Sequence, residues 1–142
     1  MKKSIILMML MGVLLIPALG ASPSSAVRLR ANVPFAFYVD NTLLPSGEYW
    51  FEMRALTLSA ASSSAVFVRN QEGTVAAWVR SMPGAGTGRL NPDQVHFNRY
   101  GSKYFLSRVE SSEFQANLIA SPAEREYRVA TKAQDTVLRA GK

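Results

Sequence analysis

The sequence predicts a mainly β protein, an antiparallel β-sandwich or partly closed barrel with a C-terminal α-helix. Three observations support this fold class. Side chains of inward and outward type alternate with a period of two through six segments in the middle of the chain, a pattern typical of strands. Short turns rich in glycine and proline separate these segments, so that successive strands are antiparallel neighbours. Near residue 121, a serine, a proline and a glutamate are spaced as at the start of a helix.

We assign residues 27–120 to one antiparallel β domain. Residues 45–47 and 70–73 contain the proline or glycine that tight turns require, and Gly101 opens a two-residue hairpin turn. Pro34 marks an edge, a bulge or a break, because proline has no N–H to donate to a strand ladder. The segments with alternating side chains are residues 35–39, 48–54, 64–70, 74–80, 94–100 and 103–110.

Residues 121–141 are expected to form the C-terminal helix. Ser121 is placed as the N-cap, Pro122 occupies the first helical position and Glu124 completes a capping box. Gly141 is a suitable helix stop. The apolar side of this helix is thin, so the helix either packs loosely on the sheet or becomes ordered only against a partner.

The N-terminus has the layout of a secretory signal peptide, which we assign to residues 1–26. Two lysines come near the start, residues 5–16 form an unbroken apolar run, and Pro17 and small residues follow. Cleavage is expected before Ala21 or before Val27. The alternative is a retained membrane anchor, but a bilayer span needs about 20 apolar residues and this run has 12. We therefore expect export to the periplasm or the medium, with no stable membrane span after cleavage.

Cysteine content and charge exclude several classes of function. The chain has no cysteine, which excludes disulfides, thiolate metal sites, cysteine nucleophiles and a lipid on the mature N-terminus. The formal net charge is +6, and the eleven arginines are scattered along the chain. A nucleic-acid site favours a cluster on one face, so we expect no nucleic-acid partner and a solvated basic surface. Weak attraction to anionic lipid or polysaccharide remains the alternative.

Two segments are predicted to be loops between strands. Residues 59–65 are small and polar, which favours a flexible connection. Residues 81–93 contain glycines at alternate positions followed by Arg89, but Arg89 stands where both common phosphate-binding loops require glycine. A strand pattern follows instead of the helix that such loops need. We therefore expect a mobile hairpin loop in which Arg89 holds an anion only by chance.

The candidates for catalysis are few. The one histidine, His96, lies at a position that the alternation directs outward, and no second histidine or cysteine exists to complete a zinc site. The chain has neither a calcium-loop motif nor the G-x-S-x-G elbow of a serine nucleophile. Glu110 and Glu113 are the nearest acidic pair outside the expected helix, with nothing in the sequence to perturb either carboxyl. We expect no catalytic residue, no metal site and no cofactor.

The two tryptophans are the candidate ligand site. If Tyr49 and Phe51 point inward, Trp50 points outward, and the same alternation directs Trp78 outward. Two tryptophans on an outer sheet face would form a platform for a sugar ring or an apolar ligand. The alternative is that the helix or the second sheet layer covers them.

Several motifs together resemble a family of small exported proteins that are abundant in soil bacteria. The residues that carry the resemblance are "VPFAF" at 33–37, "LPSGEY" at 44–49, "HFNRYGSKYFL" at 96–106 and "ERE" at 124–126. In this chain Ser46 sits in the LP-x-G-x-Y turn of the family, and Asn98 separates Phe97 from Arg99 in the third motif. The resemblance covers residues 27–129 and implies a β-rich exported domain with a terminal helix. It implies no catalytic residues, since no activity is assigned to the family.

From these observations we expect a non-catalytic exported protein, a binding or envelope-associated β module. Its partner is expected to be a polysaccharide, a lipid or another envelope protein. One alternative is a structural or assembly subunit that pairs through strand edges. A second alternative is a hydrolase, which the isolation of His96 disfavours.

The signal assignment predicts a shortened mature chain. Protein recovered from the periplasm or medium of a bacterial host should begin at Ala21 or Val27, because the small residues before each position suit signal peptidase. Intact-mass spectrometry measures this directly. Recovery of a membrane-bound chain that retains Met1 would contradict the assignment.

Overall fold

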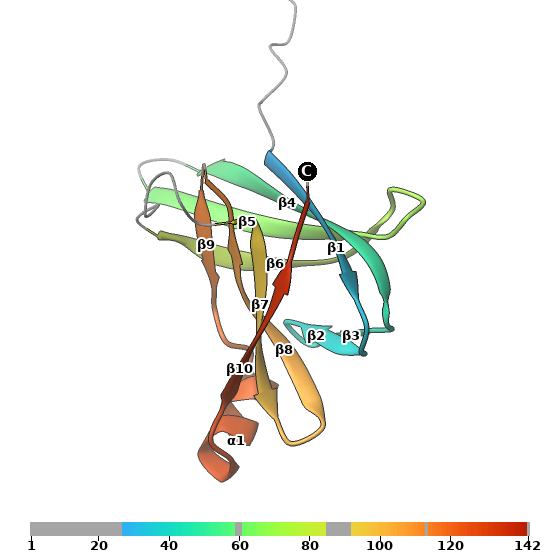
Figure 1. Cartoon of the computed structure of the whole chain (residues 1–142). Coiled ribbons are helices and arrows are strands. Elements are labelled where there is room, and N and C mark those ends of the chain that lie inside the picture. The colour runs from blue at the N-terminus through green and yellow to red at the C-terminus, as the bar shows by residue number, and fades with distance from the viewer. Residues whose placement is uncertain (1–26, 59–60, 85–91, 113, 142) are drawn as a thin grey trace, which may run out of the picture.

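The computed structural model describes residues 27–58, 61–84, 92–112 and 114–141, and Figure 1 shows their arrangement. The described residues form a 10-stranded sheet and a helix, so the predicted mainly β fold class is confirmed. The elements in chain order are β1 Val27–Val33, β2 Phe37–Val39, β3 Thr42–Leu44, β4 Gly47–Leu58, β5 Ala61–Arg69, β6 Val75–Gly84, β7 Gln94–Tyr100, β8 Lys103–Glu110, β9 Gln115–Leu118, α1 Pro122–Ala130 and β10 Gln134–Arg139.

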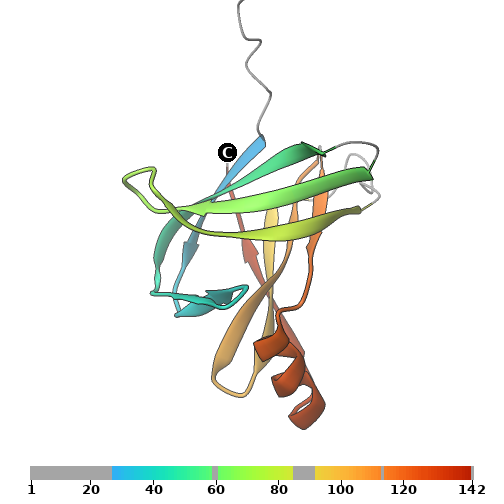
Figure 2. The ribbon, with the colours of Figure 1, turned by 180° about the vertical axis from the view of Figure 1, so that it is seen from behind.

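The sheet is strongly curved but does not close into a barrel. Its order is β1-β4-β5-β6-β9-β8-β2-β3, with β7 paired to β8 and β10 paired to β7. All pairings are antiparallel except a single parallel bridge between β2 and β8. In Figures 1 and 2 the long strands β4, β5 and β6 cross over β7, β8 and β9 at a steep angle, as the layers of a sandwich do. An isolated bridge between Arg30 and Gly141 joins the β1 edge to the C-terminal segment.

The core lies between these two layers. Alternate residues of β1 and β4 point into it, and Leu29 and Phe51 are fully buried. Three phenylalanines fill the centre, with Phe97 edge-on to Phe35 at 5.2 Å and to Phe37 at 5.3 Å between ring centroids. Burial of each such side chain stabilises the fold by about 1.5–3 kcal/mol.

The turns follow the predicted residues. Gly73 and Gly101 have φ angles of 77° and 63°, the left-handed conformation that glycine adopts without strain. The Tyr49 hydroxyl donates a 2.8 Å hydrogen bond to the Pro45 carbonyl and so ties the start of β4 to the preceding turn. Pro34 falls in the break between β1 and β2.

The helix predicted over residues 121–141 is too long. Its start is correct, since the Ser121 hydroxyl accepts a 3.1 Å hydrogen bond from the Glu124 N–H. The helix ends at Ala130, however, and residues 134–139 form β10 instead. The reason is non-local: β7 leaves an edge whose backbone groups need partners, and β10 supplies them. The capping box is half formed, because the Glu124 carboxylate accepts from Asn98 and Tyr100.

The helix does pack on the sheet. The Tyr127 ring lies 5.7 Å from the Phe105 ring, and Glu124 is buried against β7. These contacts place α1 at the lower end of the molecule in Figure 1, away from the broad face of β4, β5 and β6.

Most of the described residues in the two predicted loops lie in strands in the structure. Residues 61–65, placed in a loop, belong to β5 and pair with β4, and Ser64 and Ala65 pair with β6 as well. Backbone pairing on two sides outweighs the weak strand propensity of serine and alanine. Residues 81–84 likewise continue β6 and pair with β9. Residues 85–91 and the expected signal peptide lie outside the described residues.

Truncation of Phe97 to alanine should lower the free energy of unfolding by about 3–5 kcal/mol, because it opens a cavity among packed rings. Val129→Ala is the matched control, since Val129 is 91% exposed, and should change it by less than about 0.5 kcal/mol. Urea denaturation measures both. A loss below about 1 kcal/mol for Phe97→Ala would contradict this account of the core.

Candidate functional site

The outward side chains of β1, β4, β5 and β6 form one surface, which we call the arginine–aromatic face. Strand register places Arg28, Glu52, Phe67 and Trp78 in a single row across the four strands. The face consists of Arg28, Arg30, Trp50, Glu52, Arg54, Phe67, Arg69, Trp78 and Arg80.

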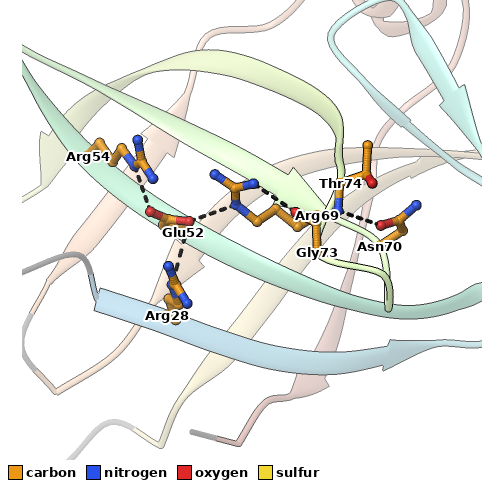
Figure 3. A network of polar contacts seen from close by, with 7 residues as sticks. All are labelled: Arg28, Glu52, Arg54, Arg69, Asn70, Gly73 and Thr74. Atoms are coloured by element: carbon orange, nitrogen blue, oxygen red, sulfur yellow. Dashed lines mark hydrogen bonds and ion pairs between the residues drawn. The ribbon is translucent and has the colours of Figure 1, made fainter.

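Glu52 is the centre of this face. Its side chain is fully buried although it points away from the core. It accepts hydrogen bonds from Arg54 Nε at 2.6 Å and Arg69 Nε at 2.9 Å, and Arg28 Nε lies 3.5 Å from its Oε2 (Figure 3). The three guanidinium groups therefore both cover the carboxylate and compensate its charge.

The arginines set the ionisation of Glu52. Burial raises the pKa of its carboxyl, because the charged form loses water. Hydrogen bonds from Arg54 and Arg69, with the charges of Arg54 and Arg28, have the opposite effect and prevail. The net result is a pKa of Glu52 below its usual value, so the group is a carboxylate at neutral pH.

The same network fixes the hairpin between β5 and β6. Arg69 Nη1 donates to the Gly73 carbonyl at 2.8 Å, and the Thr74 N–H donates to Asn70 Oδ1 at 2.8 Å (Figure 3). Glu52 thus holds Arg69, and Arg69 holds the turn from which β6 departs. The position of β6 on the face depends on this chain of contacts.

The aromatic side chains of the face are not equally accessible. The Arg54 guanidinium lies over Phe67 at 5.4 Å from the ring centroid, and Arg30 lies over Trp50 at 5.6 Å. Trp78 stacks on Phe67 with centroids 6.3 Å apart, and 53% of Trp78 is exposed. The alternation therefore placed Trp50 and Trp78 correctly on the outer face, and neither α1 nor the second layer covers Trp78.

The two tryptophans do not form an adjacent pair. Trp50 lies opposite Arg69 in the ladder, whereas Trp78 lies opposite Phe67. Phe67 lies beside Trp78 and stacks with it, and the sequence predicted neither this neighbour nor the arginines around it. The arginine cluster could have been identified only from the pairing register between strands, and composition and periodicity do not reveal that register.

A groove borders Trp78 on the side away from β5. Its volume is about 610 Å³, within the range of small-molecule sites. It runs along residues 76–80 of β6 and is bounded by the turn after β2 and the start of α1. Arg80 and Arg125 line it together with Ile119, which is 44% exposed.

His96 is buried, although it lies on the outer side that the alternation predicts: Val95 and Phe97 beside it lie in the core, and its ladder partners are Arg108 and Val137. Its Nε2 lies 3.5 Å from the Glu110 carboxylate, and its Nδ1 lies 3.5 Å from Asp135 and 3.2 Å from Arg108 Nη2. The sequence missed these neighbours because Asp135 belongs to β10, which was assigned to the helix. The register shift between His96 and Phe97 leaves Ser107 of β8 without an opposite residue on β7.

The surroundings of His96 are those of an ion-pair cluster. The carboxylates of Glu110 and Asp135 approach opposite nitrogens of the His96 ring. The Ser107 hydroxyl donates a hydrogen bond to the backbone carbonyl of His96. Within the described residues, no group of three or more histidine, aspartate or glutamate side chains could hold a metal ion. Glu113, the predicted acidic partner of Glu110, lies outside the described residues.

Comparisons with protein-family models, with curated proteins and with solved structures each found no match to this chain. Within the part of the chain that the structure describes, no helix is long and apolar enough to span a bilayer.

Glu52→Gln should lower the free energy of unfolding at pH 7 by about 1–3 kcal/mol, because two hydrogen bonds to a charged acceptor are weakened. Since the pKa of Glu52 is lowered in the folded state, its contribution is complete above about pH 4.3 and is lost as the pH falls through the folded-state value. The difference from wild type should therefore shrink below about pH 4.

Urea denaturation between pH 3 and pH 7 tests this expectation. Glu72→Gln, in the exposed turn between β5 and β6, is the matched control and should differ little from wild type across the range. A Glu52→Gln difference that stays constant from pH 7 to pH 3 would contradict the account.

Proposed function

We propose that the protein is an exported, non-catalytic binding module that holds its ligand on the arginine–aromatic face. One observation carries the proposal: Trp78 is a large aromatic side chain, more than half exposed, on a face whose other side chains are held in place. Exposure of an apolar surface set among polar groups is typical of a binding site. Aromatic faces supply contact area with little loss of conformational entropy.

The signal-like residues 1–26 support export to the periplasm or the medium, as does the resemblance to small exported β-rich proteins. The expected partners are then those of the cell envelope: a polysaccharide, a lipid surface or another envelope protein. The burial of His96 supports a non-catalytic role, because a ring that is 6% exposed offers a substrate little access.

Strand-edge assembly is the second candidate function, and one observation favours it. Among the described residues, β3 ends the sheet order and pairs with β2 alone, and Leu43 on it is 55% exposed. Such an edge can pair with another chain. Size-exclusion chromatography with light scattering distinguishes the candidates, since a strict monomer at high concentration contradicts assembly.

Trp78→Ala should weaken ligand binding at least tenfold, about 1.4 kcal/mol, because it removes the most exposed ring of the face. Isothermal titration of the purified protein against a panel of cell-wall glycans and lipid vesicles would identify the ligand and measure the loss. Val137→Ala is the control, since Val137 is an exposed apolar residue on β10, outside the face.

Two results would contradict the proposal. One is binding to a panel member that Trp78→Ala leaves unchanged. The other is no binding to any member together with measurable turnover of one of them.

A further inference from the structure

More positive charge surrounds Glu52 than is needed to compensate the charge of one buried carboxylate. A single guanidinium group would neutralise it, yet Arg28, Arg54 and Arg69 all converge on it. Three positive charges and one negative charge leave the cluster with a net charge of +2. Arginines that repel one another are kept together on an outer surface, which points to a ligand that brings further negative charge.

The geometry of the contacts strengthens this argument. All three arginines reach Glu52 through Nε, the atom nearest the chain, so their terminal Nη groups extend beyond the carboxylate. Among the described residues, the Nη groups of Arg28 and Arg54 have no hydrogen-bond partner, and Arg69 uses Nη1 for the Gly73 carbonyl. The Arg28 and Arg54 side chains are about half exposed, so these groups can reach a ligand. Glu52 therefore holds guanidinium groups in position for an outside anion.

We propose that Arg28, Arg54 and Arg69, oriented by Glu52, form an oxyanion site for a polysaccharide that bears carboxylates, a polyuronate. This inference rests on the proposed function and names the ligand class of the same face. Guanidinium forks match the two oxygens of a carboxylate, and a sugar ring stacks on Trp78.

The spacing of the face suits a chain-like ligand. Glu52 and Trp78 lie in the same register row, two strands apart, which is about 10 Å at the usual strand spacing. A short oligosaccharide covers this length and can touch both. Arg80 continues the positive charge beyond Trp78, and the groove beside Trp78 gives the chain room to leave the face.

The face favours a charged glycan over an anionic lipid. Acyl chains need a continuous apolar surface, but Arg54 covers Phe67 and Arg30 covers Trp50. Trp78 is left as the most exposed ring, which suits one sugar better than a membrane. The face carries five arginines and Glu52, and even with Glu48, which pairs with Arg30, the net charge is +3.

The test uses two polymers with the same sugar backbone: polygalacturonate, which is charged, and its fully methyl-esterified form, which is neutral. We expect the purified protein to bind polygalacturonate at least tenfold more tightly than the ester, and raised salt to weaken the binding. Arg28→Gln and Arg54→Gln should each weaken binding to polygalacturonate about fivefold or more. Lys132→Gln removes the same charge from the exposed link between α1 and β10 and should have no effect.

Folding of the variants is checked by thermal unfolding. If Arg54→Gln is unstable, Arg28→Gln decides the matter, because Arg28 makes the longest contact with Glu52 and has the most exposed side chain of the three. Arg28→Lys keeps the charge without the fork and should restore only part of the affinity.

Several outcomes would overturn the inference. Equal affinity for the two polymers, or unchanged binding in folded Arg28→Gln, would do so, as would tighter binding to anionic vesicles or to an oligothymidylate. Binding to neither polymer would also overturn it. The proposed function survives any of these results if Trp78→Ala still weakens binding to another panel member, and fails with the inference if it does not.

Discussion

The structure depends on β4 being fixed on both of its faces. Phe51 points into the core and Glu52 points to the outer surface, yet both side chains are fully buried. A shift of β4 by one residue would place a carboxylate among the apolar side chains of the core and leave three arginines without their partner. Few strands have such a strong constraint on each side, and it fixes the register of β1 and β5 along with that of β4.

Contacts that start at β4 also position the side chains proposed to face the ligand. Glu52 orients Arg69, Arg69 holds the turn at Gly73, and the turn determines where β6 carries Trp78. Arg54, also held by Glu52, covers Phe67, on which Trp78 stacks. The face is thus built before any ligand arrives, so less conformational entropy is lost on binding.

The sequence predicted the parts of the fold that depend on local pattern. The period of two identified β4 to β8 and the outward direction of Trp50 and Trp78, and Ser121 identified the start of α1 correctly. The end of the helix was wrong, because β10 forms in response to the open edge of β7, which no local signal records. The strands β3 and β9 were not separately identified, since each is short and is stabilised by its neighbours. β1 was not separately identified either, although its sequence VRLRANV alternates with a period of two.

The candidate site also has residues that local sequence pattern predicts and residues that it does not. Trp50 and Trp78 could be assigned from alternation along their own strands. The arginine cluster could not, because Arg28, Glu52 and Arg69 lie on three different strands and meet only through register. The burial of His96 was missed for the same reason, since Asp135 reaches it from β10.

The C-terminal segment contributes to the face from the opposite edge of the sheet. Gly141 exchanges two backbone hydrogen bonds with Arg30, of 2.7 and 2.8 Å, and so anchors β1 on the side away from β4. The Arg30 side chain, on the same residue, pairs with Glu48 at 2.7 Å and covers Trp50. β1 is therefore held along both edges, which keeps Arg28 within 3.5 Å of Glu52. β10, which departs from the sequence prediction, leads the chain to this bridge, so the strand that local pattern could not reveal helps to position the site.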